Sequence, residues 1–185
     1  QEVDESIAAE WTELTEGWIT ALQLAALSFA HSGREVLFRA DVTASGRYLQ
    51  DYLTAEVLQR LDPGIRQRML SVSLLDRFCA SLCEAVWPLP GAGDDKSSTG
   101  DKFLNWVLDH NLFLIPLDAH QQWFRFHHVF QHLLQNVLRE STASADIAAI
   151  HLRASQWYAE NGLVEEAIRY ALAAHDSALA VRLIV

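Results

Sequence analysis

His127 and Arg125 are the two side chains of this sequence whose types and spacing best suit the binding of an anion. They lie two residues apart, where an alternating aromatic and polar run leads directly into an amphipathic helix. Residues two apart on a strand share a face, and the first turn of a helix offers N–H groups that favour an anion. The pair is therefore a candidate contact for an anion. His127 could equally cap the helix or bond to a buried carbonyl, and Arg125 could simply cover the hairpin in solvent.

Metal binding is the second chemistry that the histidines suggest. His128 and His132 are four residues apart, which places both on one helical face at a spacing that metal sites use. A metal site needs three or four ligands, and His120 is the one further histidine nearby. Cys79 and Cys83 have no matching second pair and are predicted to be reduced, buried core residues. The sequence therefore predicts no metal.

Catalysis has no support in the motifs of the chain. There is no G-x-x-x-x-G-K-[ST] run, so nothing in these residues cradles nucleotide phosphates and places a lysine on them. No serine, histidine and aspartate, or cysteine and histidine, stand in a recognisable nucleophile motif. We therefore expect no enzyme activity, no catalytic residue and no resident cofactor in this chain.

The composition describes a globular chain of one ordinary domain plus a smaller one. The 185 residues are 50% hydrophobic and 21% charged, with a formal net charge of −10. No apolar run reaches the roughly 18 residues that cross a bilayer, and no signal peptide is visible. With only two cysteines, the chain is expected in the cytoplasm, with no membrane partner. It starts at Gln1 without a methionine and ends inside an apolar pattern, so we expect a fragment of a longer protein.

Hydrophobic periodicity predicts a mainly α chain with one small β-hairpin. A domain over residues 45–140 is expected to contain helices at 65–72, 78–86 and 103–108, then a hairpin at 112–127 and a helix at 129–138. Asp76 is the expected cap of the second of these helices. The first hairpin strand lacks a polar face, so it is predicted to be buried on both sides. Helix, helix, helix and hairpin is the order of a winged-helix domain.

Two further segments flank that domain. The hydrophobic pattern predicts helices over residues 1–44 and a helical arm over residues 141–185. Gly162 stands where a left-handed residue ends a helix, and the small and aromatic residues around it are typical of a tetratricopeptide-like helix pair. The fold class is thus mainly α: a winged helix followed by that pair.

The helix before the hairpin is the one that a DNA-binding winged helix inserts into the major groove. Here it covers residues 101–109, with one lysine and two aspartates. Phosphate contacts need lysine and arginine, so this charge pattern argues against direct nucleic-acid binding. We expect the wing to pack against protein or a ligand.

Three stretches resemble one family, the MalT-like large LuxR-type transcriptional regulators of the STAND class of signal-transduction ATPases. The first resembles the end of their ATPase module, and the next two resemble the start and end of their winged helix. The stretches are Thr15–Trp18 with Leu22–Leu27, Asp76–Phe78 with Leu82–Val86, and Asn111–Leu114, Pro116–Asp118 and Trp123–Phe130. The helix pair from Ile150 to Ala174 is similar to their arm, while Ala21 departs from the glycine of many relatives.

This resemblance implies a parent protein that binds ATP or ADP in an N-terminal domain, senses a small-molecule inducer and carries a C-terminal helix-turn-helix. Residues 1–44 would then be the last helices of the ATPase module. In such proteins a winged-helix histidine reaches the phosphates of ADP, and His127 matches it by position, with Arg125 beside it. The partners implied are the intramolecular nucleotide-binding and sensor domains.

Three functions follow as hypotheses. The leading one is a non-catalytic regulatory segment that couples nucleotide state to inducer sensing. The second is an autonomous winged-helix DNA-binding regulator, against which the shortage of basic residues counts. The third is a helical-repeat scaffold for protein interactions, which would not need a wing.

Overall fold

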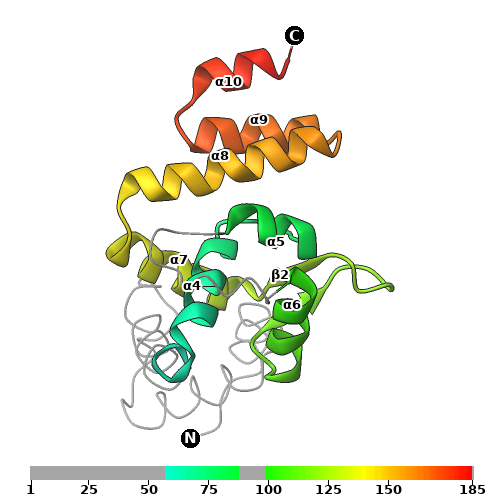
Figure 1. Cartoon of the computed structure of the whole chain (residues 1–185), viewed down its shortest axis with the longest axis vertical. Helices are drawn as coiled ribbons and strands as arrows, with labels where there is room; N and C mark the ends of the chain where they lie inside the picture. The colour runs from blue at the N-terminus through cyan, green and yellow to red at the C-terminus, as the bar shows by residue number, and fades with distance from the viewer. Residues whose placement is uncertain (1–56, 88–98, 185) are drawn as a thin grey trace, which may run out of the picture. The chain divides into compact units, whose positions relative to one another are not determined.

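Helices and one hairpin make up the regular structure of the computed structural model, which describes residues 57–87 and 99–184 (Figure 1). Asp62 to Val185 form one compact unit, and all elements described below except η2 belong to it. The mainly α class with a winged helix is confirmed. The predicted helices of residues 1–44 lie outside the described residues.

The described elements follow the predicted order. A 3-10 turn, η2, covers Leu58–Arg60. The winged helix consists of α4 (Pro63–Val72), α5 (Ala80–Val86), α6 (Gly100–Asp109), β1 (Leu114–Pro116), β2 (Phe124–Phe126) and α7 (His128–Ser141). The arm consists of α8 (Ser144–Glu160), α9 (Val164–Ala173) and α10 (Ser177–Arg182).

Helix α4 starts at a proline and is held by α7. The Asp62 carboxylate accepts a hydrogen bond of 2.8 Å from the N–H of Gly64, which satisfies one free donor of the first turn. At the other end, the Gln131 side-chain amide donates to the carbonyls of Ser73 and Leu75, at 3.0 and 2.9 Å. These bonds give the carbonyls of the turn after α4 a partner that no helix supplies.

Helix α5 begins two residues later than predicted, and Asp76 does not cap it. Cys79 is the N-cap residue, and its side chain makes no capping bond. Phe78 is fully buried and pairs with Phe124, its N–H donating to the Phe124 carbonyl and its carbonyl accepting from the Phe124 N–H, each at 2.8 Å. Pairing with β2 satisfies the backbone of Phe78 in an extended conformation, and this excludes it from the helix.

The hairpin is antiparallel, with Leu114 opposite Phe126 and Pro116 opposite Phe124. The prediction that its first strand is buried on both sides is wrong. Pro116 is exposed, and Leu114 and Ile115 are half-buried. In β2, Phe124 and Phe126 are buried and share one face while Arg125 between them is half-buried, so the hairpin packs mainly through one face.

Asp118 organises the wing tip between the two strands. Its carboxylate accepts hydrogen bonds from the backbone N–H groups of His120, Gln122 and Trp123, the last at 2.6 Å. These bonds hold the turn in which Gln121 adopts a φ of 51°. The pKa of Asp118 is lowered, above all by the Trp123 N–H. A single carboxylate thus stands in for the missing strand hydrogen bonds of the tip.

The arm packs as the predicted helix pair. Gly162 has a φ of 75°, as a left-handed residue after α8 should. The Ser155 hydroxyl, which is buried, donates 2.7 Å to the Ala167 carbonyl across the pair. The rings of Tyr158 and Tyr170 stack at 5.3 Å. Helix α8 contacts α9 and also α5, so the arm lies directly on the winged helix (Figure 1).

The two cysteines differ in burial. Both cysteines are free thiols, and Cys83 is buried while Cys79 is only half-buried, which corrects the expectation that both lie in the core. Burial raises the pKa of the Cys83 thiol. Among the described helices, none is long and apolar enough to cross a membrane.

Candidate functional site

His127 lies at the junction that the sequence predicted. It is the N-cap residue of α7, and its backbone N–H donates 2.8 Å to the carbonyl of Phe113. Its side chain makes no capping bond, so the alternative that the imidazole caps the helix does not hold. The ring is buried, at 6% exposure, and stacks on His128 with 4.7 Å between centroids.

Arg125 lies at the centre of β2, half-buried, between the buried rings of Phe124 and Phe126. Because neighbouring residues of a strand point to opposite faces, its side chain leaves on the face away from those rings. Its guanidinium donates a weak bond of 3.4 Å to the Phe126 carbonyl. Arg125 and His127 lie two residues apart at the exit of the wing, and their joint contact with a nucleotide stays a prediction.

The three histidines that were weighed as metal ligands differ in exposure and position. His120 is exposed on the wing tip, His132 is exposed on α7, and His128 is half-buried. Within residues 57–87 and 99–184, no group of three or more histidine, cysteine, aspartate or glutamate side chains could hold a metal ion.

Helix α6 presents an acidic surface where a DNA-reading helix would be basic. It buries Phe103, Leu104 and Val107 and exposes Asp101, Lys102 and Asp109. Beside it, Glu84 of α5 accepts a bond of 2.6 Å from the N–H of Gly100 and adds a further carboxylate. The absence of nucleic-acid binding by this helix stays a prediction, which rests on this charge pattern.

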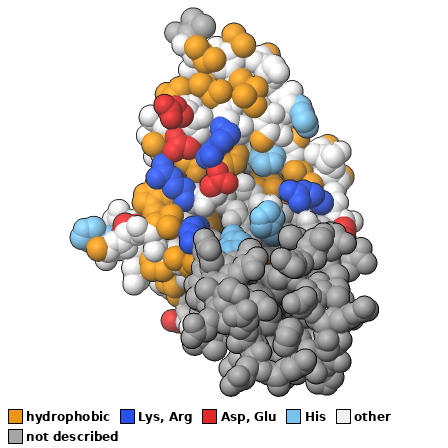
Figure 2. Space-filling view, turned by 180° about the vertical axis from the view of Figure 1, so that it is seen from behind, with side chains coloured by type: hydrophobic (Ala, Val, Ile, Leu, Met, Phe, Trp, Pro, Cys, Tyr) orange, Lys and Arg blue, Asp and Glu red, His pale blue; other side chains and the backbone are white. Residues whose placement is uncertain are grey.

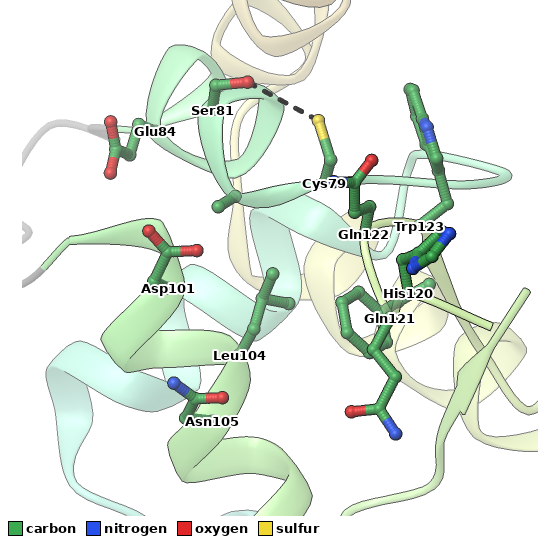
Figure 3. A pocket seen from close by; sticks show the side chains of 12 residues that line it. Cys79, Ser81, Glu84, Asp101, Leu104, Asn105, His120, Gln121, Gln122 and Trp123 are labelled. Atoms are coloured by element: carbon green, nitrogen blue, oxygen red, sulfur yellow. Dashed lines mark hydrogen bonds between the residues drawn. The ribbon is translucent and has the colours of Figure 1, made fainter. Parts of the chain in front are cut away.

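A pocket of about 570 Å³ lies between α5, α6 and the wing tip. Figure 3 shows Glu84 and Asp101 at one end and His120 and Trp123 at the other. Near the middle, the Cys79 thiol and the Ser81 hydroxyl lie 3.5 Å apart. Carboxylates at its border disfavour a phosphate ligand there.

A polar contact between the winged helix and the arm was not predicted from the sequence. The Arg77 guanidinium donates 2.7 Å to the carboxylate of Glu166, and Arg169 pairs with Asp76 at 2.6 Å. Arg77 also lies over the ring of Trp123, 4.9 Å from its centroid. Figure 2 shows the face on which acidic and basic side chains gather beside hydrophobic ones.

Two tyrosine hydroxyls reinforce this contact. Tyr158 donates 3.1 Å to the carbonyl of Arg77, and the Tyr170 hydroxyl accepts 3.0 Å from the N–H of Asp76. Burial raises the pKa of both tyrosines, that of Tyr170 to about 12, so both hydroxyls stay protonated. The pKa of Glu166 is lowered, first by a backbone N–H and then by Arg77. Both tyrosines are buried, as core residues of a helix pair are.

One signal in the sequence pointed toward the contact. Glu166, Arg169 and Tyr170 recur at the three- and four-residue spacing that places them on one face of α9. The face is charged and aromatic, which is unusual for a surface that packs. The residues that this face contacts are Asp76 and Arg77. Arg77 lies 89 residues before Glu166 in the sequence, and no periodic pattern relates segments so far apart.

Comparison with known proteins places the chain in a family. The model of the MalT winged helix domain matches residues 54–146. The serine/threonine-protein kinase PknK of Mycobacterium tuberculosis is 35% identical over 94% of this chain and 15% of its own length. The HTH-type transcriptional regulator MalT of Klebsiella pneumoniae is 34% identical over 87% of this chain and 17% of its own, and that of Vibrio campbellii 29% over 98% and 19%. The chain spans less than a fifth of each of these relatives. It belongs to the MalT winged-helix domain family.

Proposed function

We propose that this chain is a non-catalytic regulatory segment of a larger ATP-dependent signalling protein, in which the winged helix couples nucleotide state to the state of a sensor. The observation that carries the proposal is the contact of the wing with the arm. Trp123 of the wing lies against Arg77, which is paired with Glu166 of α9. A wing engaged by its own arm, beside an acidic α6, suits movement between domains better than DNA reading.

The relatives support a role that is independent of output. By name, one relative is a protein kinase and the others are transcriptional regulators. Each of them nevertheless matches most of the length of this chain. A segment shared by proteins with two different outputs is best explained by what they have in common, which is regulation. The complete protein is then either a LuxR-type transcription regulator or a kinase, and the segment serves both in the same way.

His127 and Arg125 are the proposed contacts to the phosphates of ADP, which a separate domain would hold in the cytoplasm. The N-terminus of α7 fits an anion, since its first turn contains no acidic residue. A bound ADP would supply negative charge at this point. The imidazole of His127 and the guanidinium of Arg125 would donate to it and hold the resting state. Binding of inducer and ATP would release this contact.

The test measures ADP dissociation from the full-length protein with a fluorescent ADP. The substitution His127→Ala should speed dissociation about tenfold, because a hydrogen bond to a charged group contributes roughly 1.5 kcal/mol or more. His132→Ala, on the exposed side of the same helix, is the matched control and should leave the rate unchanged. An unchanged ADP off-rate in His127→Ala would remove His127 from the switch.

Two alternatives are tested with the same material. If the chain bound duplex DNA with a steep dependence on salt, it would be a DNA-binding regulator and the proposal would be wrong. If neither ADP nor ATP changed the hydrogen exchange of the winged helix in the full-length protein, a scaffold role would replace the switch. We expect no binding to DNA and slower exchange in α7 with ADP.

A further inference from the structure

We propose that Asp76–Phe78 is a coupling segment, which ties the wing strand β2 to the helix pair α8–α9 through a tie that is partly ionic and therefore releasable. This inference deepens the proposed function, on which its regulatory meaning rests. The coupling segment lies between α4 and α5, so it belongs to the core of the winged helix. It contacts the wing on one side and the arm on the other.

The contact with the wing is built from backbone hydrogen bonds and rings. Phe78 exchanges two bonds of 2.8 Å with Phe124, so it acts as a third strand beside β2. Its ring lies 5.1 Å from that of Phe126 and is fully buried. Arg77 covers the ring of Trp123 just before β2. A displacement of β2 therefore displaces the coupling segment as well, because buried backbone bonds are costly to leave unpaired.

The contact with the arm is built from charges and hydroxyls. Glu166, Arg169 and Tyr170 lie on one face of α9, and each of them bonds to Asp76 or Arg77. Tyr158 of α8 adds its bond to the Arg77 carbonyl. Trp157, next to it, meets Trp123 of the wing edge-on at 6.2 Å. The arm is thus joined to Asp76 and Arg77, and Arg77 also contacts the wing.

The two sides differ in how they respond to salt. The side chains of Arg77 and Glu166 are 44% and 21% exposed, and those of Arg169 and Asp76 are 55% and 61% exposed. Exposed ion pairs are weak and are screened within a Debye length of about 8 Å at physiological salt. The bonds of Phe78 are buried and are not screened. The arm side is therefore the side that releases.

Release does not require the arm to detach. Helix α8 still packs on α5, where the Arg153 guanidinium donates 3.2 Å to the carbonyl of Val86. The link from α7 to α8 is short and extended, through Thr142 with φ −130° and ψ 138°. Loss of the ion pairs thus frees α9 to turn about the packed contact of α5 and α8. This gives the arm two positions relative to the wing.

Hydrogen–deuterium exchange of the full 185-residue chain tests the coupling segment. In the double variant Arg77→Ala, Arg169→Ala, the amides of α9 and that of Asp76, which is bonded to Tyr170, should exchange about tenfold faster. The amide of Phe78, which is bonded to β2, and those of α4 and α7 should stay protected. The matched control is Arg139→Ala, which removes an exposed arginine whose bond lies within α7. It should leave α9 unchanged. Unchanged exchange of α9 in the double variant, or equal acceleration in α4 and α7, would overturn the inference.

Salt provides a readout that a merely structural role would not move. Raising NaCl from about 0.05 M to about 1 M should speed exchange of α9 in the wild type and have no effect in the double variant. The substitution Tyr158→Phe removes an uncharged bond and should keep the salt dependence. Loss of the salt dependence in Tyr158→Phe would overturn the ionic tie.

These outcomes separate the inference from the proposed function, because exchange is measured without nucleotide. If the double variant freed α9 but the full-length protein released ADP at the wild-type rate in both His127→Ala and the double variant, the coupling segment would stand and the nucleotide switch would fall. The reverse pattern, with normal exchange and faster ADP release in His127→Ala, would retain the switch and exclude the coupling segment.

Discussion

Glu84 accepts a hydrogen bond of 2.6 Å from the backbone N–H of Gly100, and through it α5 supplies a partner for the first residue of α6. The two helices approach very closely at this point. A Cβ atom on Gly100 would lie 2.1 Å from the carbonyl oxygen of Ala80, far inside contact distance. The crossing of α5 and α6 therefore requires glycine for space rather than for a special φ.

Substitution of Gly100 tests this crossing. Gly100→Ala should lower the free energy of unfolding by about 3 kcal/mol, because the backbone of Ala80 cannot move without displacing α5. Urea denaturation followed by circular dichroism measures the change. Gly162→Ala is the control for conformation alone, since its φ is 75° and nothing lies within 4 Å of a Cβ there. It should cost about 1 kcal/mol, and an equal cost for both would contradict the steric argument.

Removal of the Gln131 amide should destabilise the turn after α4. Gln131→Ala deletes two hydrogen bonds, but the Ser73 carbonyl keeps a bond of 2.8 Å from the Gln135 amide, so the loss falls mainly on the Leu75 carbonyl. The free energy of unfolding should fall by about 1.5 kcal/mol. Gln156→Ala is the matched control, since its bond to Glu160 is exposed and within one helix. It should change the free energy of unfolding by less than about 0.5 kcal/mol. Equal effects of the two substitutions would show that water replaces the Gln131 amide as a hydrogen-bond donor without loss of stability.

The free energy of unfolding should decrease as the pH is lowered below 6.5, because His151 resists protonation in the folded chain. Desolvation, with a smaller contribution from His175, lowers its pKa below 6.5. In that window the unfolded chain binds a proton that the folded chain does not, so acid favours unfolding. In His151→Phe, which preserves a ring against Tyr170, the loss of stability between about pH 7 and about pH 5 should be smaller. An identical slope in the two proteins, measured by urea denaturation at each pH, would contradict this.

Asp118 should confer an acid-dependent order on the wing tip. Its pKa is lowered from 3.8 because its carboxylate accepts backbone hydrogen bonds, first of all from Trp123. The stabilisation is present above 3.8 and is lost as the pH falls below the lowered pKa. The amide signal of Trp123 should follow that loss in an NMR titration. Asp118→Asn should abolish the titration of this amide and Asp109→Asn should not, and persistence in Asp118→Asn would identify another group as its cause.

Much of the fold could be predicted from local patterns. The apolar face of α7 follows from the periodicity of its own residues. The end of α8 follows from the backbone preference of Gly162. The hairpin also follows from alternation and turn residues. The position of His127 at the start of α7 could be predicted for the same reason, since it depends only on where β2 ends and α7 begins.

The errors arose where distant residues decide. Phe78 forms a single bridge to Phe124, and one bridging residue has no periodicity that distinguishes it from the helix that follows. Asp76 looked like a cap because caps are local, whereas its backbone and side chain bond to Tyr170 and Arg169 of the arm. Burial of β1 on both sides was wrong because an apolar run does not show whether distant elements cover both faces of a strand.

Pro116 reduces the tendency of the edge strand β1 to pair with a strand of another molecule. In the register of the hairpin, the N–H groups of Ile115 and Leu117 point toward β2, so those of residues 114 and 116 point outward. Proline has no N–H, which leaves Leu114 as the sole outward donor of β1. So short an edge with one donor is a poor template for another strand. At high concentration this hairpin should therefore resist the edge-to-edge stacking that begins aggregation.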